Sequence, residues 1–233
     1  MKINIDELAK KLNIKFKNKE LLKIAVTHRS YLNEHRNEDI EHNERMEFLG
    51  DAVLELVVTE YLFSHFLEKP EGELTNLRAA LVKGDTLSKV GQELGLEKFL
   101  LLSRGEAKAK GRSRNYIIAN TVEAVIGAIY LDQGYEKTQE FIIKNIIKEL
   151  PVIIKEELFR DAKSFFQEKA QELNGITPTY KLISQSGPDH NKNFQIGVYL
   201  ENDLIAKGRG KSKQEAQQEA AKKALKRKKW DQD

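Results

Sequence analysis

The chain has 233 residues, of which 40% are hydrophobic and 32% are charged, with a formal net charge of +3 and no cysteine. The lack of cysteine excludes disulfides, thiolate metal sites and a cysteine nucleophile. Apolar residues are too abundant for a disordered chain, yet no apolar run reaches the ~20 residues of a membrane helix, and Met1–Lys11 lacks an apolar leader. We therefore expect a cytoplasmic protein without a membrane partner.

Apolar residues recur at helical spacing through the first 150 residues, where strand-like alternation is nearly absent. The pattern predicts an all-α domain over residues 1–156, with short helices near residues 5–12 and 21–26. Longer helices are predicted over 46–66, 74–82, 86–94, 117–131 and 138–150. A break is expected at Pro70-Glu71-Gly72, and residues 103–115, with two Gly and five Lys or Arg, predict an exposed basic loop.

The pattern changes after Phe159. A helix over 162–173 ends at Asn174-Gly175, and alternating apolar residues then predict strands over 179–186, 194–200 and 204–208. Ser212 caps a last helix that runs to about Lys228. We predict a small α+β module of order α-β-β-β-α over residues 160–229. Residues 160–233 contain 15 Lys and Arg against 10 Asp and Glu, whereas residues 1–159 contain 24 against 26, so the two modules differ in charge.

Four carboxylates share one face of the helix that begins near Glu44. At about 100° per residue, they fall within an arc of about 80°; they are Glu44, Glu47, Asp51 and Glu55. Like charges at this spacing repel, and a divalent cation that takes oxygen ligands, such as Mg²⁺, would relieve the repulsion. A solvated acidic stripe explains the same pattern, and the residues alone leave both interpretations open.

A second polar pair lies in the apolar helix 117–131, where Asn120 and Glu123 are one turn apart. An isolated charge such as Glu123 among apolar neighbours is costly unless it is paired or bound to a metal. Glu71 in the predicted break is a third candidate, although an ordinary loop acid explains it equally well.

The stretches HNERMEFLGDAVLELVV (residues 42–58), Glu71-Gly72 and ANTVEAVIGAIYLDQG (residues 119–134) resemble, in order and spacing, those of bacterial ribonuclease III. The C-terminal stretches FFQEKAQ, TPTY, GPDH and GKSKQEAQQEAAKKAL resemble the landmarks of the double-stranded-RNA-binding domain that follows the nuclease domain in that family. The similarity covers essentially the whole chain. It implies an endoribonuclease, dependent on Mg²⁺ with Mn²⁺ as a substitute, that cuts double-stranded RNA. The implied products have staggered ends with 5′-phosphate and 3′-hydroxyl groups, and the implied roles are ribosomal RNA and mRNA processing.

The resemblance also implies roles for single residues. The metal ligands would be Glu47, Asp51, Asn120 and Glu123. The catalytic acids would be Asp51 and Glu123, with Glu44 and Glu71 as supporting groups in the same acidic valley. Phe48 would pack into the partner subunit of a homodimer, whereas from sequence alone simple core packing is an equal alternative.

Double-stranded RNA is recognised through minor-groove 2′-hydroxyl groups and the phosphates between them, and helix starts favour phosphate. The implied RNA contacts are Gln167 and Glu168 on the first helix, Pro188 and His190 in the loop, and Lys211, Lys213, Gln214 and Gln217 at the last helix. The family usually has further Lys at the two Gln positions of that last helix, so we expect somewhat weaker binding. Arg112 and Arg114 are second-rank candidates in the basic loop.

At one position the chain departs from the family, which has Asp where this chain has Asn120. An amide oxygen can still bind Mg²⁺ but brings no charge. A natural variant that still cuts, a chain that mainly binds RNA and an inactivating replacement all remain open. We favour retained catalysis with a higher metal requirement, because the other acids are present. The chief rival is a double-stranded-RNA-binding protein with weakened or lost cleavage, and the third possibility is a helical scaffold with an RNA anchor.

Overall fold

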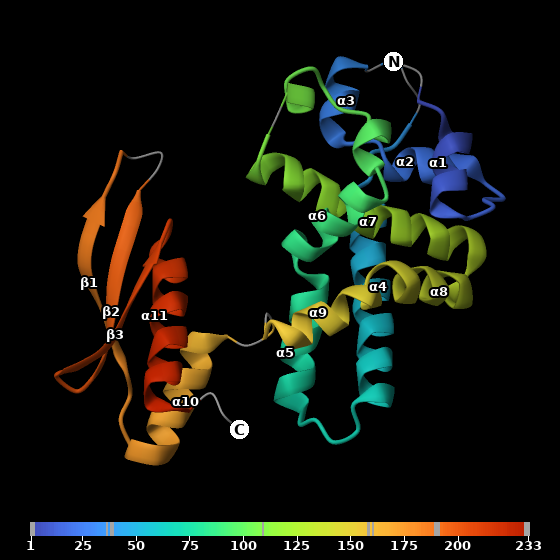
Figure 1. Cartoon of the computed structure of the whole chain (residues 1–233). Helices are drawn as coiled ribbons and strands as arrows, with labels where there is room; N and C mark the ends of the chain where they lie inside the picture. The colour runs from blue at the N-terminus through green and yellow to red at the C-terminus, as the bar shows by residue number, and fades with distance from the viewer. Residues whose placement is uncertain are drawn as a thin grey trace. The chain divides into compact units, whose positions relative to one another are not determined.

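The structure, a computed structural model, describes residues 3–35, 37, 40–108, 110–157, 159, 161–188 and 192–230. The chain divides into two compact units, residues 1–159 and residues 160–233 (Figure 1). The first unit is helical and the second combines two helices with a three-stranded sheet, which confirms the predicted fold class. No helix within the described ranges is long and apolar enough to cross a membrane.

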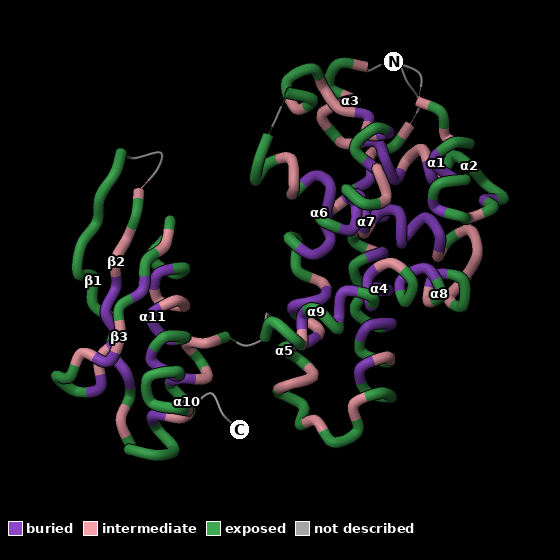
Figure 2. The backbone as a smooth tube through the Cα atoms, in the orientation of Figure 1, coloured by how far each residue is buried: buried purple, intermediate pink, exposed green. Residues whose placement is uncertain are grey.

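In the first unit, shorter helices surround two long ones. The long helices are α4 (Glu44–His65) and α7 (Arg112–Gln133), each of 22 residues. The others are α1 (Ile5–Leu12), α2 (Lys19–Ala25), α3 (Arg29–Glu34), α5 (Glu71–Val82), α6 (Gly84–Glu93), α8 (Tyr135–Asn145) and α9 (Leu150–Lys155), with 3-10 turns at Leu96–Phe99, Glu106–Lys108 and Ile147–Glu149. The middle of α7 is buried except at the half-buried Asn120 and Glu123, which makes it the central helix of the core (Figure 2).

The two long helices cross with their backbones in contact. A Cβ atom on Gly50 of α4 would lie 1.8 Å from the carbonyl oxygen of Glu123 on α7. A Cβ atom on Gly127 of α7 would lie 2.4 Å from the carbonyl oxygen of Met46 on α4. Only a hydrogen atom fits at either position, so the two glycines set how closely α4 and α7 approach. The side chains that flank the crossing are brought together as a result.

Hydrogen bonds from Asn43 tie the start of α4 to the end of α2 and to the segment that follows it. The backbone N–H of Asn43 donates to the Thr27 carbonyl oxygen at 2.9 Å. Its buried side-chain Nδ2 donates to the Ala25 carbonyl oxygen at 3.3 Å. Asn43 therefore gives α4 no side-chain cap, and the first turn of α4 is positioned by these contacts instead.

The second unit packs two helices against an antiparallel sheet. After α10 (Ala162–Asn174) come β1 (Thr179–Ser186), β2 (Asn193–Leu200), β3 (Asp203–Gly210) and α11 (Lys213–Lys228), and the sheet order is β1-β2-β3. Phe166, Val198 and Ala220 are fully buried in its core. Gly208 lets α11 lie directly against β3, because a Cβ atom there would be 2.2 Å from the Ala216 carbonyl oxygen.

Three local predictions differ from the structure. The helix predicted over 138–150 ends at Asn145, and a new helix starts at Leu150 because Pro151 lacks the N–H that a continuous helix needs. Glu71, expected in a break, is the first residue of α5, directly after Pro70, whose fixed φ suits a helix start. The residues from Arg112 to Asn115, expected in a loop, form the first turn of α7.

Gly50→Ala should destabilise the protein by about 3 kcal/mol, because the new methyl group would overlap backbone atoms of α7 that cannot rotate away. Gly72→Ala is the matched control, since Gly72 lies in α5 with nothing within 4 Å of its Cβ position. That variant should be neutral or more stable by up to about 1 kcal/mol. Equilibrium urea unfolding measures both, and equal stability of the two variants would contradict the close crossing.

Candidate functional site

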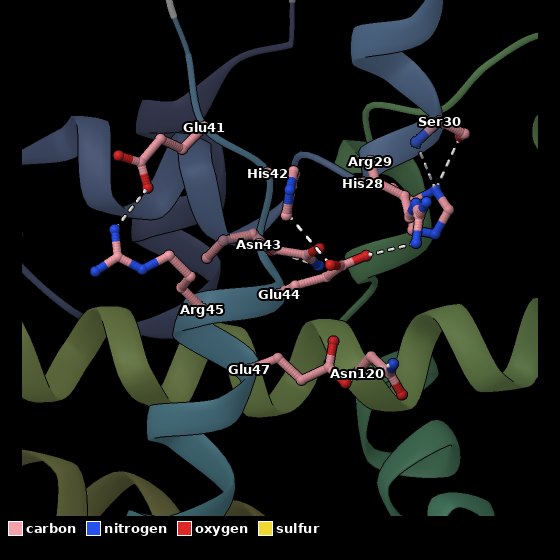
Figure 3. Close-up of polar contacts among 11 residues, drawn as sticks. His28, Arg29, Ser30, Glu41, His42, Asn43, Glu44, Arg45, Glu47 and Asn120 are labelled. Atoms are coloured by element: carbon pink, nitrogen blue, oxygen red, sulfur yellow. Dashed lines mark hydrogen bonds and ion pairs between the residues drawn. The ribbon is translucent and has the colours of Figure 1, made fainter.

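Four polar side chains from α4 and α7 meet beside the glycine crossing. Glu47 and Asp51 lie one turn apart on α4, and Asn120 and Glu123 lie one turn apart on α7. The Nδ2 atom of Asn120 donates a hydrogen bond to Oε1 of Glu47 at 2.7 Å (Figure 3). The fold thus brings together the four residues that the resemblance implies as metal ligands, and we call them the acidic centre.

Burial raises the pKa values of all three acids of this centre, and neighbouring carboxylates add to the increase. Burial raises the pKa of Glu123 to about 8, and the charges of Asp51 and Glu47 contribute to the increase. Burial also raises the pKa of Glu47, despite the opposing effect of the hydrogen bond from Asn120. Burial raises the pKa of Asp51 as well, with a contribution from Glu55. A positive charge among these groups would favour their ionised forms.

The donor chemistry of the centre fits a hard divalent cation. Three carboxylates and one amide supply oxygen atoms, which Mg²⁺ and Mn²⁺ prefer. In the part of the chain that the structure describes, no three acidic, histidine or cysteine side chains are already gathered around one point. Binding an ion would therefore require the side chains to rotate, and Asn120 would have to present its oxygen rather than its N–H.

Asn120 changes the charge balance of the centre. Its amide N–H donates to Glu47, whereas an aspartate at this position would place a second carboxylate against that oxygen. With asparagine at position 120, Glu47 meets a hydrogen-bond donor instead of a second negative charge. A cation is therefore not needed to offset repulsion between these two side chains.

Neither supporting acid is part of the acidic centre, although Glu44 is close enough to Glu47 to add to the increase in the pKa of that acid. Glu44 pairs with Arg29 (Oε1 to Nη1, 3.4 Å) and with His42 (Oε2 to Nδ1, 3.8 Å), as Figure 3 shows. Glu71 begins α5 beyond the far end of α4, a helix about 33 Å long at 1.5 Å per residue. Its carboxylate accepts a hydrogen bond from Thr75 Oγ1 at 2.9 Å. Within one chain, Glu71 is therefore not gathered with the other acids.

Phe48 does not belong to the core of its own chain, because 82% of its surface is exposed. Leu56, Phe63 and Leu67 are exposed as well. Phe48, Leu56 and Phe63 fall within about 80° on the face of α4, at about 100° per residue. We call these four residues the apolar strip. An exposed apolar surface of this kind commonly marks a site of association.

In the second unit, the predicted RNA contacts on α10 lie at an open hollow. Gln167 and Glu168 line this hollow, together with neighbouring polar residues of the same helix. Pro188, in the loop after β1, is exposed. His190 and its neighbour Asp189 lie outside the described residues.

The start of α11 carries the second set of predicted contacts. Ser212 caps this helix by accepting a hydrogen bond from the Glu215 N–H at 3.1 Å. Three predicted contacts around the cap are exposed: Lys211, Lys213 and Gln214. Gln217 is instead half-buried and accepts a hydrogen bond from Lys163 Nζ at 3.0 Å. This contact with α10 keeps Gln217 from being freely presented at the surface.

Sequence reasoning missed the charged neighbours of Glu44 and overestimated the exposure of Arg114. His42 is only two residues from Glu44, so its proximity could have been predicted, but Arg29 is 15 residues away and no local pattern indicates the contact. The side chain of Arg114 is only 18% exposed, with Nε 3.8 Å from Oε1 of Glu97. Arg112 is exposed as expected.

A helical domain with converging carboxylates, followed by an α-β-β-β-α module with a basic helix start, defines a class of two-domain proteins that act on RNA. Residues 18–150 match the family model described as ribonuclease-III-like, and residues 162–228 match the double-stranded RNA binding motif. Ribonuclease 3 of Nitratiruptor sp. is 47% identical over 222 residues, which are 95% of this chain and 96% of that protein. Ribonuclease 3 of Carboxydothermus hydrogenoformans is 48% identical over 224 residues, 96% of this chain and 95% of that protein.

A solved structure of the nuclease domain of ribonuclease III from Campylobacter jejuni is 42% identical, with a TM-score of 0.57, and covers 64% of this chain and 99% of its own. The chain belongs to the ribonuclease III family. Its first unit is the nuclease domain, and its second unit is the double-stranded-RNA-binding domain.

The raised pKa of Glu123 predicts how the stability of the metal-free protein depends on pH. Its pKa lies near 4.5 in an unfolded chain and at about 8 in the folded one, so the folded protein binds the proton more tightly. This stabilisation is fully present below about pH 4.5 and is lost as the pH rises to about 8. Glu123→Gln, which cannot ionise, should therefore be more stable than the parent at pH 8 and above in EDTA, with the gap closing toward pH 5.

Urea unfolding in EDTA across this pH range measures the effect. Glu140→Gln on α8, where the replaced carboxylate is exposed, is the control and should follow the parent. A constant difference between Glu123→Gln and the parent at all pH values would contradict the buried position of Glu123.

Proposed function

We propose that the protein is a Mg²⁺-dependent endoribonuclease that hydrolyses phosphodiester bonds of double-stranded RNA. The proposed products carry 5′-phosphate and 3′-hydroxyl groups at staggered ends, and the proposed role is ribosomal RNA and mRNA processing in the cytoplasm. The observation that carries the proposal is the meeting of Glu47, Asp51 and Glu123 from two helices in a chain of the ribonuclease III family.

Within this proposal, Glu47, Asp51, Asn120 and Glu123 would hold Mg²⁺, with Mn²⁺ as a substitute. When bound, such ions supply an activated water and charge stabilisation for the leaving oxygen. The chain itself keeps three carboxylates partly buried and close together, and in their ionised forms they attract a cation. No side chain has to serve as a covalent nucleophile.

The second domain would bind the RNA duplex. Gln167 and Glu168 on α10 are suited to minor-groove 2′-hydroxyl groups, because both are polar and lie at an open hollow. Lys211 and Lys213 at the start of α11 are suited to phosphates, since the helix dipole and two exposed charges act together there. The loop with Pro188 and His190 would reach a second minor groove.

A homodimer would cover the apolar strip and would bring Glu71 of each chain closer to the acids of the other. If two copies of α4 pack antiparallel about a two-fold axis midway between Phe48 and Phe63, each Phe48 faces the Phe63 of the partner subunit. The same operation carries Glu71 of one chain toward the Glu44 end of the other. The solved structure from Campylobacter jejuni is described as flexible in a region involved in dimer formation, which supports this proposal for the present chain.

Phe48→Glu tests the dimer. Since 82% of Phe48 is exposed, a charge should not affect folding of the single chain but should prevent burial at an interface. Light scattering after size-exclusion chromatography should show a dimer for the parent and a monomer for Phe48→Glu. Leu173→Glu on α10, where Leu173 is 55% exposed, is the matched control and should remain dimeric. A monomeric parent, or a dimeric Phe48→Glu variant, would contradict the proposal.

The rival function is double-stranded-RNA binding with weakened or lost cleavage, and the observation that favours it is the neutral Asn120. The two functions separate in one experiment, in which the protein is incubated with a long labelled RNA duplex in Mg²⁺ or EDTA and examined on denaturing and native gels. The parent should give short products only with Mg²⁺. Glu123→Gln should bind the duplex without cutting it, and the exposed change Glu140→Gln should leave cleavage intact.

Uncut but retarded RNA would favour the rival function, and Asn120→Asp would then show whether the lost charge is the cause. In a protein that cuts, Asn120→Asp should lower the Mg²⁺ concentration needed for half-maximal cleavage, because a fourth carboxylate strengthens the attraction for the ion. An unchanged titration would mean that residue 120 is not a ligand. Cleavage by Glu123→Gln would overturn the site assignment.

A further inference from the structure

The carboxylate of Glu44 faces Arg29 and His42 rather than the acidic centre. Arg29 Nη1 lies 3.4 Å from Oε1 of Glu44, and His42 Nδ1 lies 3.8 Å from Oε2. Figure 3 shows the Glu44 side chain directed toward these two groups, whereas Glu47, one turn further along α4, is directed toward Asn120. Two successive acids of α4 therefore have different partners.

Fold stability does not account for this ion pair. The Arg29 side chain is 68% exposed, that of Glu44 is 46% exposed and that of His42 is 39% exposed. Ion pairs this accessible to water contribute only about 0–1 kcal/mol. Arg29 and Glu44 are open to a ligand that approaches from solvent, and His42 is open to it except at Nδ1, which is buried.

The acidic centre has an electrostatic requirement that these groups can meet. RNA carries one negative charge per phosphate, so the carboxylates of the centre repel the molecule that has to approach them. Arg29 and His42 lie next to the centre, since Glu44 is close enough to Glu47 to raise the pKa of that acid. The backbone N–H groups in the first turn of α4, which no side chain caps, add a partial positive charge at the same place.

We propose that Arg29 and His42 bind a backbone phosphate of the RNA duplex beside the acidic centre, and that Glu44 positions these two side chains and is not a metal ligand. Arginine suits this role because its guanidinium group can donate two parallel hydrogen bonds to a phosphate. The inference rests on the proposed function, for it assigns the residues by which the nuclease domain holds its substrate.

Arg29→Gln and His42→Gln test the phosphate contact, each in the full-length Glu123→Gln protein with Mg²⁺. Fluorescence anisotropy with a labelled RNA duplex, over a series of KCl concentrations, gives the Kd and its salt dependence. Each variant should raise the Kd about two- to fivefold. Arg29→Gln should also reduce the slope of log Kd against log salt by about 0.7 to 0.9, as expected for one lost phosphate contact.

Lys137→Gln is the matched control, because it removes one exposed charge from α8, where Lys137 pairs with Glu140 at 2.7 Å. Its Kd and salt slope should equal those of the parent. If Arg29→Gln and His42→Gln behave like this control, the phosphate contact is overturned while the proposed function stands. If the Glu123→Gln parent does not bind duplex RNA, both are overturned.

Glu44→Gln tests the second half of the proposal through metal binding instead of cleavage. Bound Mg²⁺ should raise the Tm of the otherwise unchanged chain. Glu44→Gln should keep this rise in Tm, whereas Glu47→Gln should lose most of it. An equal loss in both variants would make Glu44 a metal ligand and overturn its positioning role. A parent whose Tm does not respond to Mg²⁺ would overturn the proposed metal site, and the RNA comparison would still decide the roles of Arg29 and His42.

Discussion

The contact between the backbones of α4 and α7 is the constraint on which the nuclease domain depends. Gly50 and Gly127 leave room for a carbonyl oxygen of the opposite helix, so the helices cross closer than any side chain at these positions would allow. Each long helix carries its polar pair within one turn of the crossing. The same close approach that packs the core therefore also assembles the acidic centre.

This crossing concentrates negative charge in a partly buried place, and that charge has to be balanced. Burial raises the pKa values of Glu47, Asp51 and Glu123, and neighbouring carboxylates add to the increase, so a cation would favour their ionised forms. Asn120 supplies part of the balance by donating a hydrogen bond to Glu47. In the proposed function, metal ions at the acidic centre would supply the rest and the chemistry, while Arg29 and His42 beside Glu44 would hold the substrate.

The second domain uses the same packing device for a different purpose. Gly208 and Gly210 of β3 let α11 lie against the sheet with its backbone close to the strand. The small alanines of α11 are buried there, while its charged residues stay outside. A short module can thus present a basic helix start on a stable core.

The sequence by itself determined the fold class, most helices and strands, and the two polar pairs. Periodicity and spacing are local properties, so they can be read without knowing which elements pack together. Only the tertiary structure decided which groups meet. The hydrogen bond from Asn120 to Glu47 joins residues 73 positions apart. The contact of Glu44 with Arg29 depends on where the start of α3 lies relative to α4. Glu71 lies far from the other acids of the same chain. Such contacts follow from how closely helices cross, which is set by packing between residues far apart in the chain.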